Sequence, residues 1–196
     1  MNFCWHTILG IIAGLLAMGA VIPYIKDILH GTSKPNTVSF AIWEFLLLIS
    51  FLAQLTSGAS WSILMLAGDL IGTGIIVILC LKGYGYHKYG WTEWVCLALA
   101  ILAIVLWQVT KEPVLAIIFA LIADLMAAVP TVVKTYRDPW SEAPTMWFII
   151  AFAAILSLVS TEIHDAPNIL FPAYLLCING LVGTMALVGR KLKPKI

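Results

Sequence analysis

The chain has 196 residues, of which 62% are hydrophobic and only 11% charged, and its mean hydropathy is +1.01. So few charges cannot cover the surface of a soluble globule, which excludes that class and predicts an integral membrane protein. The formal net charge of +1 is close to zero, but it conceals an uneven distribution of the basic residues along the chain.

The apolar residues fall into seven long segments with short connections. A membrane-spanning helix needs roughly 20 mostly apolar residues, because it rises about 1.5 Å per residue across about 30 Å of hydrocarbon. Helices also satisfy their own backbone hydrogen bonds, as lipid requires, so we expect an all-α membrane protein. The predicted spans are residues 7–24, 38–56, 60–82, 91–109, 113–134, 144–161 and 169–190.

The basic residues lie almost entirely on one side of this seven-helix arrangement. Positive charge is retained on the cytoplasmic side of a membrane, so we expect the N-terminus outside and the C-terminus in the cytoplasm. Compact loops and the lack of eukaryotic sorting signals favour a prokaryotic plasma membrane. Lys111 lies on the opposite side from the other ten, which are Lys26, Lys34, Lys82, Lys88, Lys134, Arg137, Arg190, Lys191, Lys193 and Lys195.

Two stretches of the chain share one layout: small residues and valine, a proline, a basic turn, a second proline and then a tryptophan. When Pro23 is superposed on Pro130, Trp43 falls near Trp147. The two stretches are MGAVIPYIKDILHGTSKPNTVSFAIW, residues 18–43, and MAAVPTVVKTYRDPWSEAPTMW, residues 126–147.

This duplication predicts two parallel three-helix repeats joined by a linker helix. Each copy has three helices, so one additional helix between the copies is needed for both to have the same orientation in the membrane. The predicted units are residues 1–90 with the first three spans, residues 91–112 with the linker helix, and residues 113–196 with the last three spans and a short basic tail.

A proline near the cytoplasmic end of the first helix of each repeat, followed by a basic turn in this three-plus-one-plus-three order, resembles the PQ-loop and SWEET transporter superfamily. The resemblance covers nearly the whole chain. The glutamine that follows the proline in the family motif is Tyr24 in the first copy and Thr131 in the second. The resemblance implies alternating access about Pro23 and Pro130, and transporters built from repeats bind their solute near the midplane of the repeat interface.

The two prolines also have a direct physical consequence. Proline removes a backbone donor and clashes with the carbonyl one turn earlier, so Pro23 and Pro130 are expected to weaken and kink their helices. A single proline could simply end a tilted helix. Two prolines at matched positions favour a hinge.

Three polar residues lie about half-way along their spans, namely Asp69, Asp124 and Asn179. An aspartate at the bilayer centre costs at least about 2.5 kcal/mol, so we expect both carboxyls to face the bundle interior at a binding site. Neither has a Lys or Arg at comparable depth, which predicts that at least one carries and exchanges a proton during transport. Asp69 could instead serve helix packing, because it lies between Gly68 and Gly72.

Asn179 superposes within a residue of Asp69 in the repeat alignment. It also matches the position in the last helix where SWEET-like transporters carry a substrate-binding asparagine, so the resemblance implies the same role here. Trp43 and Trp147 lie near the starts of the second and sixth spans. Such tryptophans commonly anchor helices in the headgroup region, but their repeat symmetry favours a place beside the solute pathway.

Two glutamates, Glu44 and Glu142, lie near these tryptophans and are predicted to form an inner gate. Exposed ion pairs typically contribute only about 0–1 kcal/mol, so this latch would be weak. The expected partners are Lys26 or Lys34 for Glu44, and Lys134 or Arg137 for Glu142.

The remaining motifs do not indicate an enzyme. The chain has no CxxC pair among its four cysteines, no ligand-like histidine spacing, no phosphate-binding glycine loop and no nucleophile elbow, so we expect no cofactor, no metal and no catalytic residues. The aromatic and basic loop KGYGYHKYGW, residues 82–91, is typical of a membrane interface and not of a nucleic-acid surface.

These features predict a transporter or facilitator of a small, mostly neutral polar solute such as a sugar, an amino acid or a nucleoside-like molecule. Its expected partners are that solute and the lipid bilayer, with a homo-oligomer left open. The alternative is a receptor or sorting protein on the same scaffold that transports nothing. A retinal-type receptor is disfavoured, because the last span contains no lysine for a Schiff base.

Overall fold

A computed structural model describes residues 5–31, 35, 37–58, 60–85, 90–110, 112–137, 139–142 and 144–192. These residues form helices and no strands, which confirms the all-α prediction for the described part of the chain. The helices are α1 (Trp5–Leu29), α2 (Thr37–Thr56), α3 (Ile63–Leu79), α4 (Trp91–Thr110), α5 (Pro113–Arg137), α6 (Pro144–Ser160) and α7 (Ala166–Leu192). A π-helical turn (Cys80–Tyr84) continues α3, and a short 3-10 turn (Pro139–Ser141) precedes α6.

Several helices have the length and composition of membrane spans. Among the described residues, four helical segments are long and apolar enough to cross a bilayer: Trp5–Leu29, Ser39–Thr56, Ile63–Tyr84 and Ala166–Leu192. Shorter apolar stretches are Ile117–Val129 in α5 and Pro144–Ser160 in α6. Large apolar side chains such as Leu15, Ile71 and Phe152 are exposed on the outside of the bundle, where water would penalise them and lipid would not. The chain is an integral membrane protein.

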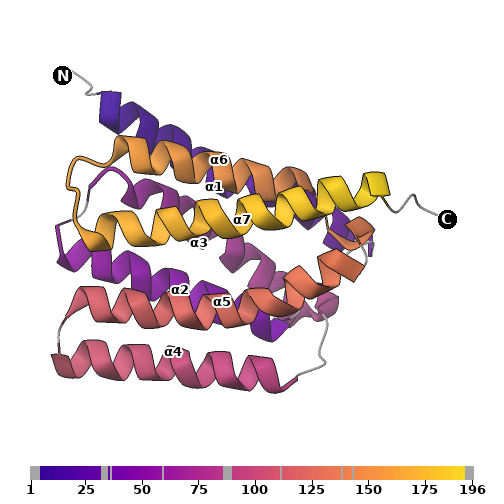
Figure 1. Cartoon of the computed structure of the whole chain (residues 1–196), viewed down its shortest axis with the longest axis horizontal. Coiled ribbons are helices and arrows are strands. Elements are labelled where there is room, and N and C mark those ends of the chain that lie inside the picture. The colour runs from indigo at the N-terminus through magenta and orange to yellow at the C-terminus, as the bar shows by residue number, and fades with distance from the viewer. Residues whose placement is uncertain are drawn as a thin grey trace.

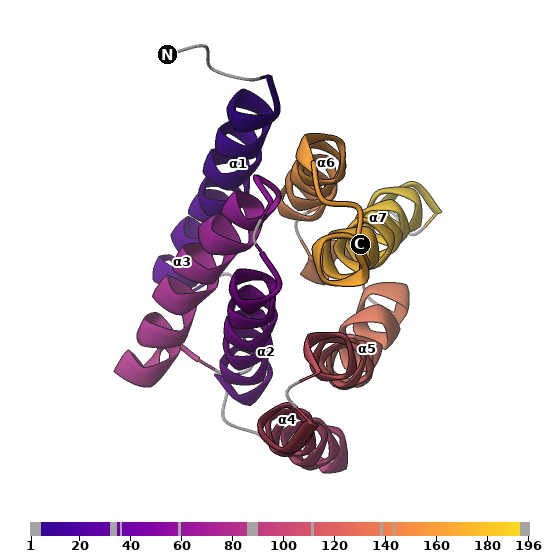
Figure 2. The ribbon, with the colours of Figure 1, turned by 90° about the vertical axis from the view of Figure 1, so that its left-hand side faces the viewer.

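The helices pack in two groups of three. In one group α3 lies between α1 and α2, and in the other α7 lies between α5 and α6 (Figures 1 and 2). The groups meet where α1 packs against α6 and α2 packs against α5. Helix α4 lies at the edge of the bundle against α5 and α2, as Figure 2 shows. The N- and C-termini lie at opposite ends of the bundle (Figure 1).

Glycines let α1 and α3 approach closely. A Cβ atom added to Gly14 would lie 2.6 Å from the carbonyl oxygen of Leu64, and Gly68 packs directly on the backbone of Gly14. Such contacts between small residues hold helices together in lipid, where burial of apolar surface gives little gain. Gly68 and Gly72 therefore face α1, and the intervening Asp69 points elsewhere.

Both helices that contain a matched proline continue beyond it. Helix α1 runs past Pro23 to Leu29, and α5 runs past Pro130 to Arg137. Neither proline ends its helix, so the interpretation of each as a simple helix terminator is wrong. The side chain of Pro130 lies outside the described atoms.

Candidate functional site

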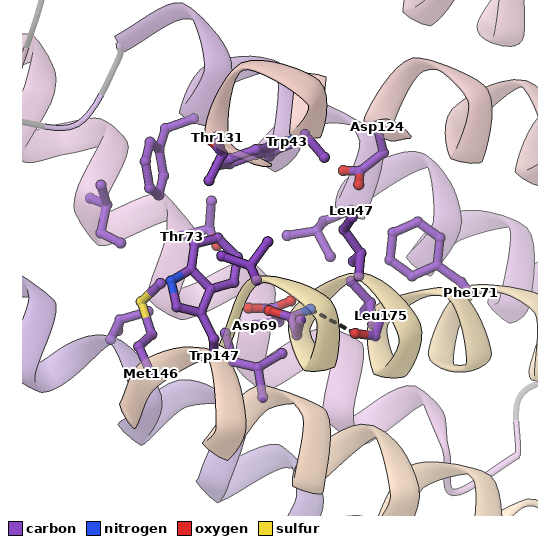
Figure 3. Close-up of a pocket in the computed structure, with 18 residues that line it drawn as sticks. Trp43, Leu47, Asp69, Thr73, Asp124, Thr131, Met146, Trp147, Phe171 and Leu175 are labelled. Atoms are coloured by element: carbon purple, nitrogen blue, oxygen red, sulfur yellow. Dashed lines mark hydrogen bonds between the residues drawn. The ribbon is translucent and has the colours of Figure 1, made fainter. Parts of the chain in front are cut away.

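A cavity of about 80 Å³ lies between the two groups of helices. Five helices supply one predicted site residue each to its wall: Trp43 from α2, Asp69 from α3, Asp124 from α5, Trp147 from α6 and Asn179 from α7. The labelled side chains of the tryptophans and aspartates surround the same space in Figure 3. The structure thus brings together all five residues that the sequence singles out for solute binding.

Asp69 is buried and faces the cavity. Its exposed fraction is 6%, and it accepts no hydrogen bond within the described part of the chain. Two further carboxyls act on it electrostatically, Asp124 of α5 and Glu44 of α2. A buried carboxyl near other carboxyls is costly to keep ionised in a low-dielectric interior unless a proton or a cation neutralises it.

Asp124 is held by Tyr174, a residue that the sequence analysis does not include in the site. The hydroxyl of Tyr174 on α7 donates a hydrogen bond to Oδ2 of Asp124 on α5. A tyrosine within an apolar span needs a partner for its hydroxyl, and that rule is the signal that would have pointed to Tyr174.

The side chain of Asn179 is oriented by its own helix. Its Nδ2 donates to the carbonyl oxygen of Leu175 at 2.8 Å, the bond drawn as a dashed line in Figure 3. This bond uses one of the two N–H groups of Nδ2, so the side chain retains its second N–H donor and the acceptor Oδ1. Asn179 is 4% exposed, so this acceptor is sheltered from bulk solvent.

The two matched tryptophans have different polar surroundings. Trp147 donates its Nε1–H to Oε2 of Glu142 at 3.2 Å. Trp43 packs edge-on against Phe40, with ring centroids 5.0 Å apart, and its buried Nε1 has no hydrogen-bond partner among the described residues. Both rings line the cavity.

Glu142 is buried, and its carboxyl accepts the hydrogen bond that holds Trp147 in place. Its main-chain oxygen accepts a 2.6 Å hydrogen bond from Arg190. The half-buried carboxyl of Glu44 lies against Gly74 of α3 and forms no ion pair with Lys26 within the described residues. Lys34 and the side chains of Lys134 and Arg137, the other expected gate partners, lie outside the described atoms.

The residues that follow the two matched prolines have different surroundings. Thr131, after Pro130, lines the cavity, as does Thr73 of α3. Tyr24, after Pro23, is buried and stacks on Phe40 with ring centroids 5.8 Å apart. Only the second copy therefore presents this position to the cavity.

The end of the bundle where α1 begins is closed by buried hydrogen bonds between the two groups. Asn168, at the start of α7, is 0% exposed, and its Oδ1 accepts hydrogen bonds from the amide of Ser60 at 3.2 Å and the hydroxyl of Ser62 at 3.5 Å. Ser157 of α6 donates to the carbonyl oxygen of Ser62, and the amide of Glu162 donates to the hydroxyl of Ser60. We call these five residues the end network. None of its five residues is among those predicted from the sequence to form the site.

Within the described residues, no group of three or more His, Cys, Asp or Glu side chains is placed to hold a metal ion. Comparison of the chain with protein-family models, curated proteins and solved structures finds no match. The function is therefore inferred from the site itself.

Proposed function

We propose that the protein is a membrane transporter or facilitator for a small polar solute. The observation that carries this proposal is the cavity at the meeting of the two helix groups, to which α2, α3, α5, α6 and α7 each contribute a polar or aromatic side chain. A buried polar site within apolar helices is costly to maintain and is typical of a solute pathway.

The arrangement proposed in the membrane is seven spanning helices in a three-plus-one-plus-three order, with α4 as the linker, as in PQ-loop and SWEET-like transporters. Two sets of contacts support it. Helix α3 packs between α1 and α2 as α7 packs between α5 and α6, and the α1–α6 contact is matched by the α5–α2 contact. A two-fold relation between the repeats requires both correspondences.

We further propose that the N-terminus faces the outside and that the membrane is a prokaryotic plasma membrane. Lys26 near the end of α1 and Arg190 and Lys191 near the end of α7 lie at the end of the bundle opposite the end network, which agrees with retention of positive charge in the cytoplasm. In this orientation the end network would close the cavity toward the outside of the cell.

The proposed mechanism is alternating access. A cavity of about 80 Å³ holds a few water molecules, so a larger solute enters only if the helix groups move apart. Opening outward would break the bonds of Asn168 to Ser60 and Ser62. Pro23 and Pro130 weaken the helical hydrogen bonding of α1 and α5 and would let these helices bend.

Proton coupling is part of the proposal. Asp69 and Asp124 line the cavity, and none of its described lining residues is Lys, Arg or His. A carboxyl without a cationic neighbour must be neutralised, and a proton that enters or leaves with the solute would do this.

The test is a screen of sugars, amino acids, nucleosides and small amines, by thermal stabilisation and by uptake into proteoliposomes at two pH values. We expect at least one solute to stabilise and to cross the membrane with the wild-type protein, and to do neither with Asn179→Ala. Glu112→Gln, an exposed carboxyl between α4 and α5, is the matched control. Stabilisation without flux for every solute that binds would replace the transporter with the receptor alternative.

A further inference from the structure

Most indole and amide N–H donors of the cavity wall are already in use or buried. The indole N–H of Trp147 donates to Glu142, and the amide Nδ2 of Asn179 donates to Leu175. The indole N–H of Trp43 is buried away from open space. Of these groups, only the second N–H of Asn179 Nδ2 is not engaged or buried.

The acceptors of the wall, in contrast, are available. Asp69 accepts no hydrogen bond, and Oδ1 of Asn179 accepts none, within the described part of the chain. Asp124 receives the Tyr174 hydroxyl on Oδ2 and retains Oδ1. An ionised carboxylate only accepts, and an amide oxygen only accepts, so the cavity presents acceptors to its ligand. Thr73 and Thr131 add hydroxyl groups, which can accept as well as donate.

The cavity also lacks positive charge. Its described lining includes two aspartates and no basic side chain, and the third carboxyl that acts on Asp69 belongs to Glu44. Aromatic rings of Trp43, Trp147 and Phe171 form part of the same wall. The face of an aromatic ring attracts a cation, most strongly when the cation is shielded from water.

We propose that the cavity binds a small organic cation with a primary ammonium group. An ammonium group supplies three donors and no acceptor, which complements Asp69, Asp124 and Oδ1 of Asn179, while its carbon chain or ring packs against the tryptophans. A sugar hydroxyl needs donors as well as acceptors, and the wall offers fewer donors than acceptors. This inference rests on the proposed function and revises the mostly neutral solute expected from the sequence.

Binding of such a cation is linked to protons. The ammonium group and a proton compete for the carboxyl of Asp69, on which Asp124 of α5 and Glu44 of α2 also act, with Tyr174 of α7 hydrogen-bonded to Asp124. Cation binding is therefore expected to release protons and to become tighter as pH rises, as long as the amine stays protonated.

The experiment is calorimetric binding to the purified protein in lipid nanodiscs, with two pairs of ligands of nearly equal shape: benzylammonium against benzyl alcohol, and ethylammonium against ethanol. We expect at least one ammonium ion to bind ten-fold or more tightly than its alcohol and to release protons into a weakly buffered solution. Equal affinity within both pairs, or binding without proton release, would overturn the inference.

Two variants locate the binding group. Asp69→Asn and Asp124→Asn should each weaken ammonium binding ten-fold or more while alcohol binding stays unchanged, and Glu112→Gln should alter neither. An asparagine can still accept a hydrogen bond from the Tyr174 hydroxyl, so Asp124→Asn is expected to keep the α5–α7 contact. This variant therefore tests the cation site even if Asp69→Asn folds poorly. Undiminished ammonium binding by both folded variants would refute the assignment.

Binding and flux are measured separately, so the two proposals fail separately. Selective ammonium binding without uptake supports the cation site and contradicts transport. Uptake of sugars without ammonium selectivity supports transport and contradicts the cation site.

Discussion

Tyr174 on α7 donates its hydroxyl hydrogen bond to Asp124 on α5 at the wall of the central cavity. This bond joins two helices of the same group and satisfies a carboxyl that would otherwise be buried alone. It also distinguishes the two cavity aspartates, because Asp69 has no such donor in the described structure. Asp69 is consequently free to interact with a solute, whereas Asp124 is fixed in orientation.

Replacing Tyr174 by phenylalanine should destabilise the protein. The change leaves Oδ2 of Asp124 without its donor, and an unsatisfied buried polar group typically costs about 1–3 kcal/mol. We expect a lower midpoint of thermal unfolding in detergent for Tyr174→Phe. Tyr84→Phe, at an exposed tyrosine in the π-helical turn, should leave the midpoint unchanged. Equal midpoints for both variants and the wild type would show that the bond contributes nothing to stability.

Asn168→Ala should loosen the end of the bundle where α1 begins. The amide of Ser60 donates to Oδ1 of Asn168, so the variant removes the acceptor that protects this amide from exchange. Hydrogen exchange measured by mass spectrometry should become faster at residues 60–65. Asn179→Ala, which lies outside the end network, is the control and should leave this segment as protected as in the wild type.

Gly14→Ala should weaken the packing of α1 on α3. The new methyl group would lie 2.6 Å from the Leu64 carbonyl oxygen, and overpacking of this kind typically costs about 1–3 kcal/mol. Gly19→Ala adds the same methyl to the same helix at a position with no atom within 4 Å. We expect unfolding measurements to show a loss for Gly14→Ala and no loss, or a gain of about 0.5–1 kcal/mol, for Gly19→Ala. The reverse order of stability would contradict the packing described for α1 and α3.

Pro23→Ala should slow transport without harming the fold. Alanine restores the backbone donor within α1 and strengthens the helix, so the midpoint of unfolding should rise while the uptake rate falls several-fold. Pro172→Ala is a suitable control, because Pro172 also lies inside a helix, α7. Pro172 is not one of a matched pair, since α3, the corresponding helix of the other group, contains no proline. A hinge role for Pro23 is refuted if both variants transport at the wild-type rate.

Uptake should respond to a proton gradient through Asp69. If a proton and the solute compete for this carboxyl, vesicles with an acidic interior should take up the solute faster than vesicles at equal pH, because protons then leave as the solute enters. The Asp69→Asn variant should lose this difference, whereas Glu112→Gln should keep it. A wild-type rate that is independent of pH, and unchanged in Asp69→Asn and Asp124→Asn, would exclude proton coupling.

Depth along each helix follows from the sequence, because the rise per residue is constant and lipid requires apolar spans of a certain length. Asp69, Asp124 and Asn179 could therefore be assigned to one level, and the structure places all three at one cavity. Rotation about the helix axis is not predictable in the same way. These spans are apolar on every side, so no polar face indicates which side points inward.

Packing decides the rotation. Gly68 and Asp69 are neighbours in sequence, and the close contact of Gly68 with Gly14 directs Gly68 to α1 and leaves Asp69 facing the cavity. Trp43 lines the cavity, whereas the next residue, Glu44, lies against Gly74 of α3. Successive residues of a helix point about 100° apart, so only the contacts between helices determine which of two neighbours reaches the site.

Composition and the spacing of apolar residues alone determined that this chain folds as helices in a membrane, because lipid leaves the backbone few other ways to pair its polar groups. The tertiary structure alone decided that Tyr174 satisfies Asp124, that Asn168 joins the two helix groups and that the cavity presents acceptors. Each of these contacts joins side chains far apart in sequence or depends on which atoms are already bonded. Such information arises only when the helices pack against one another.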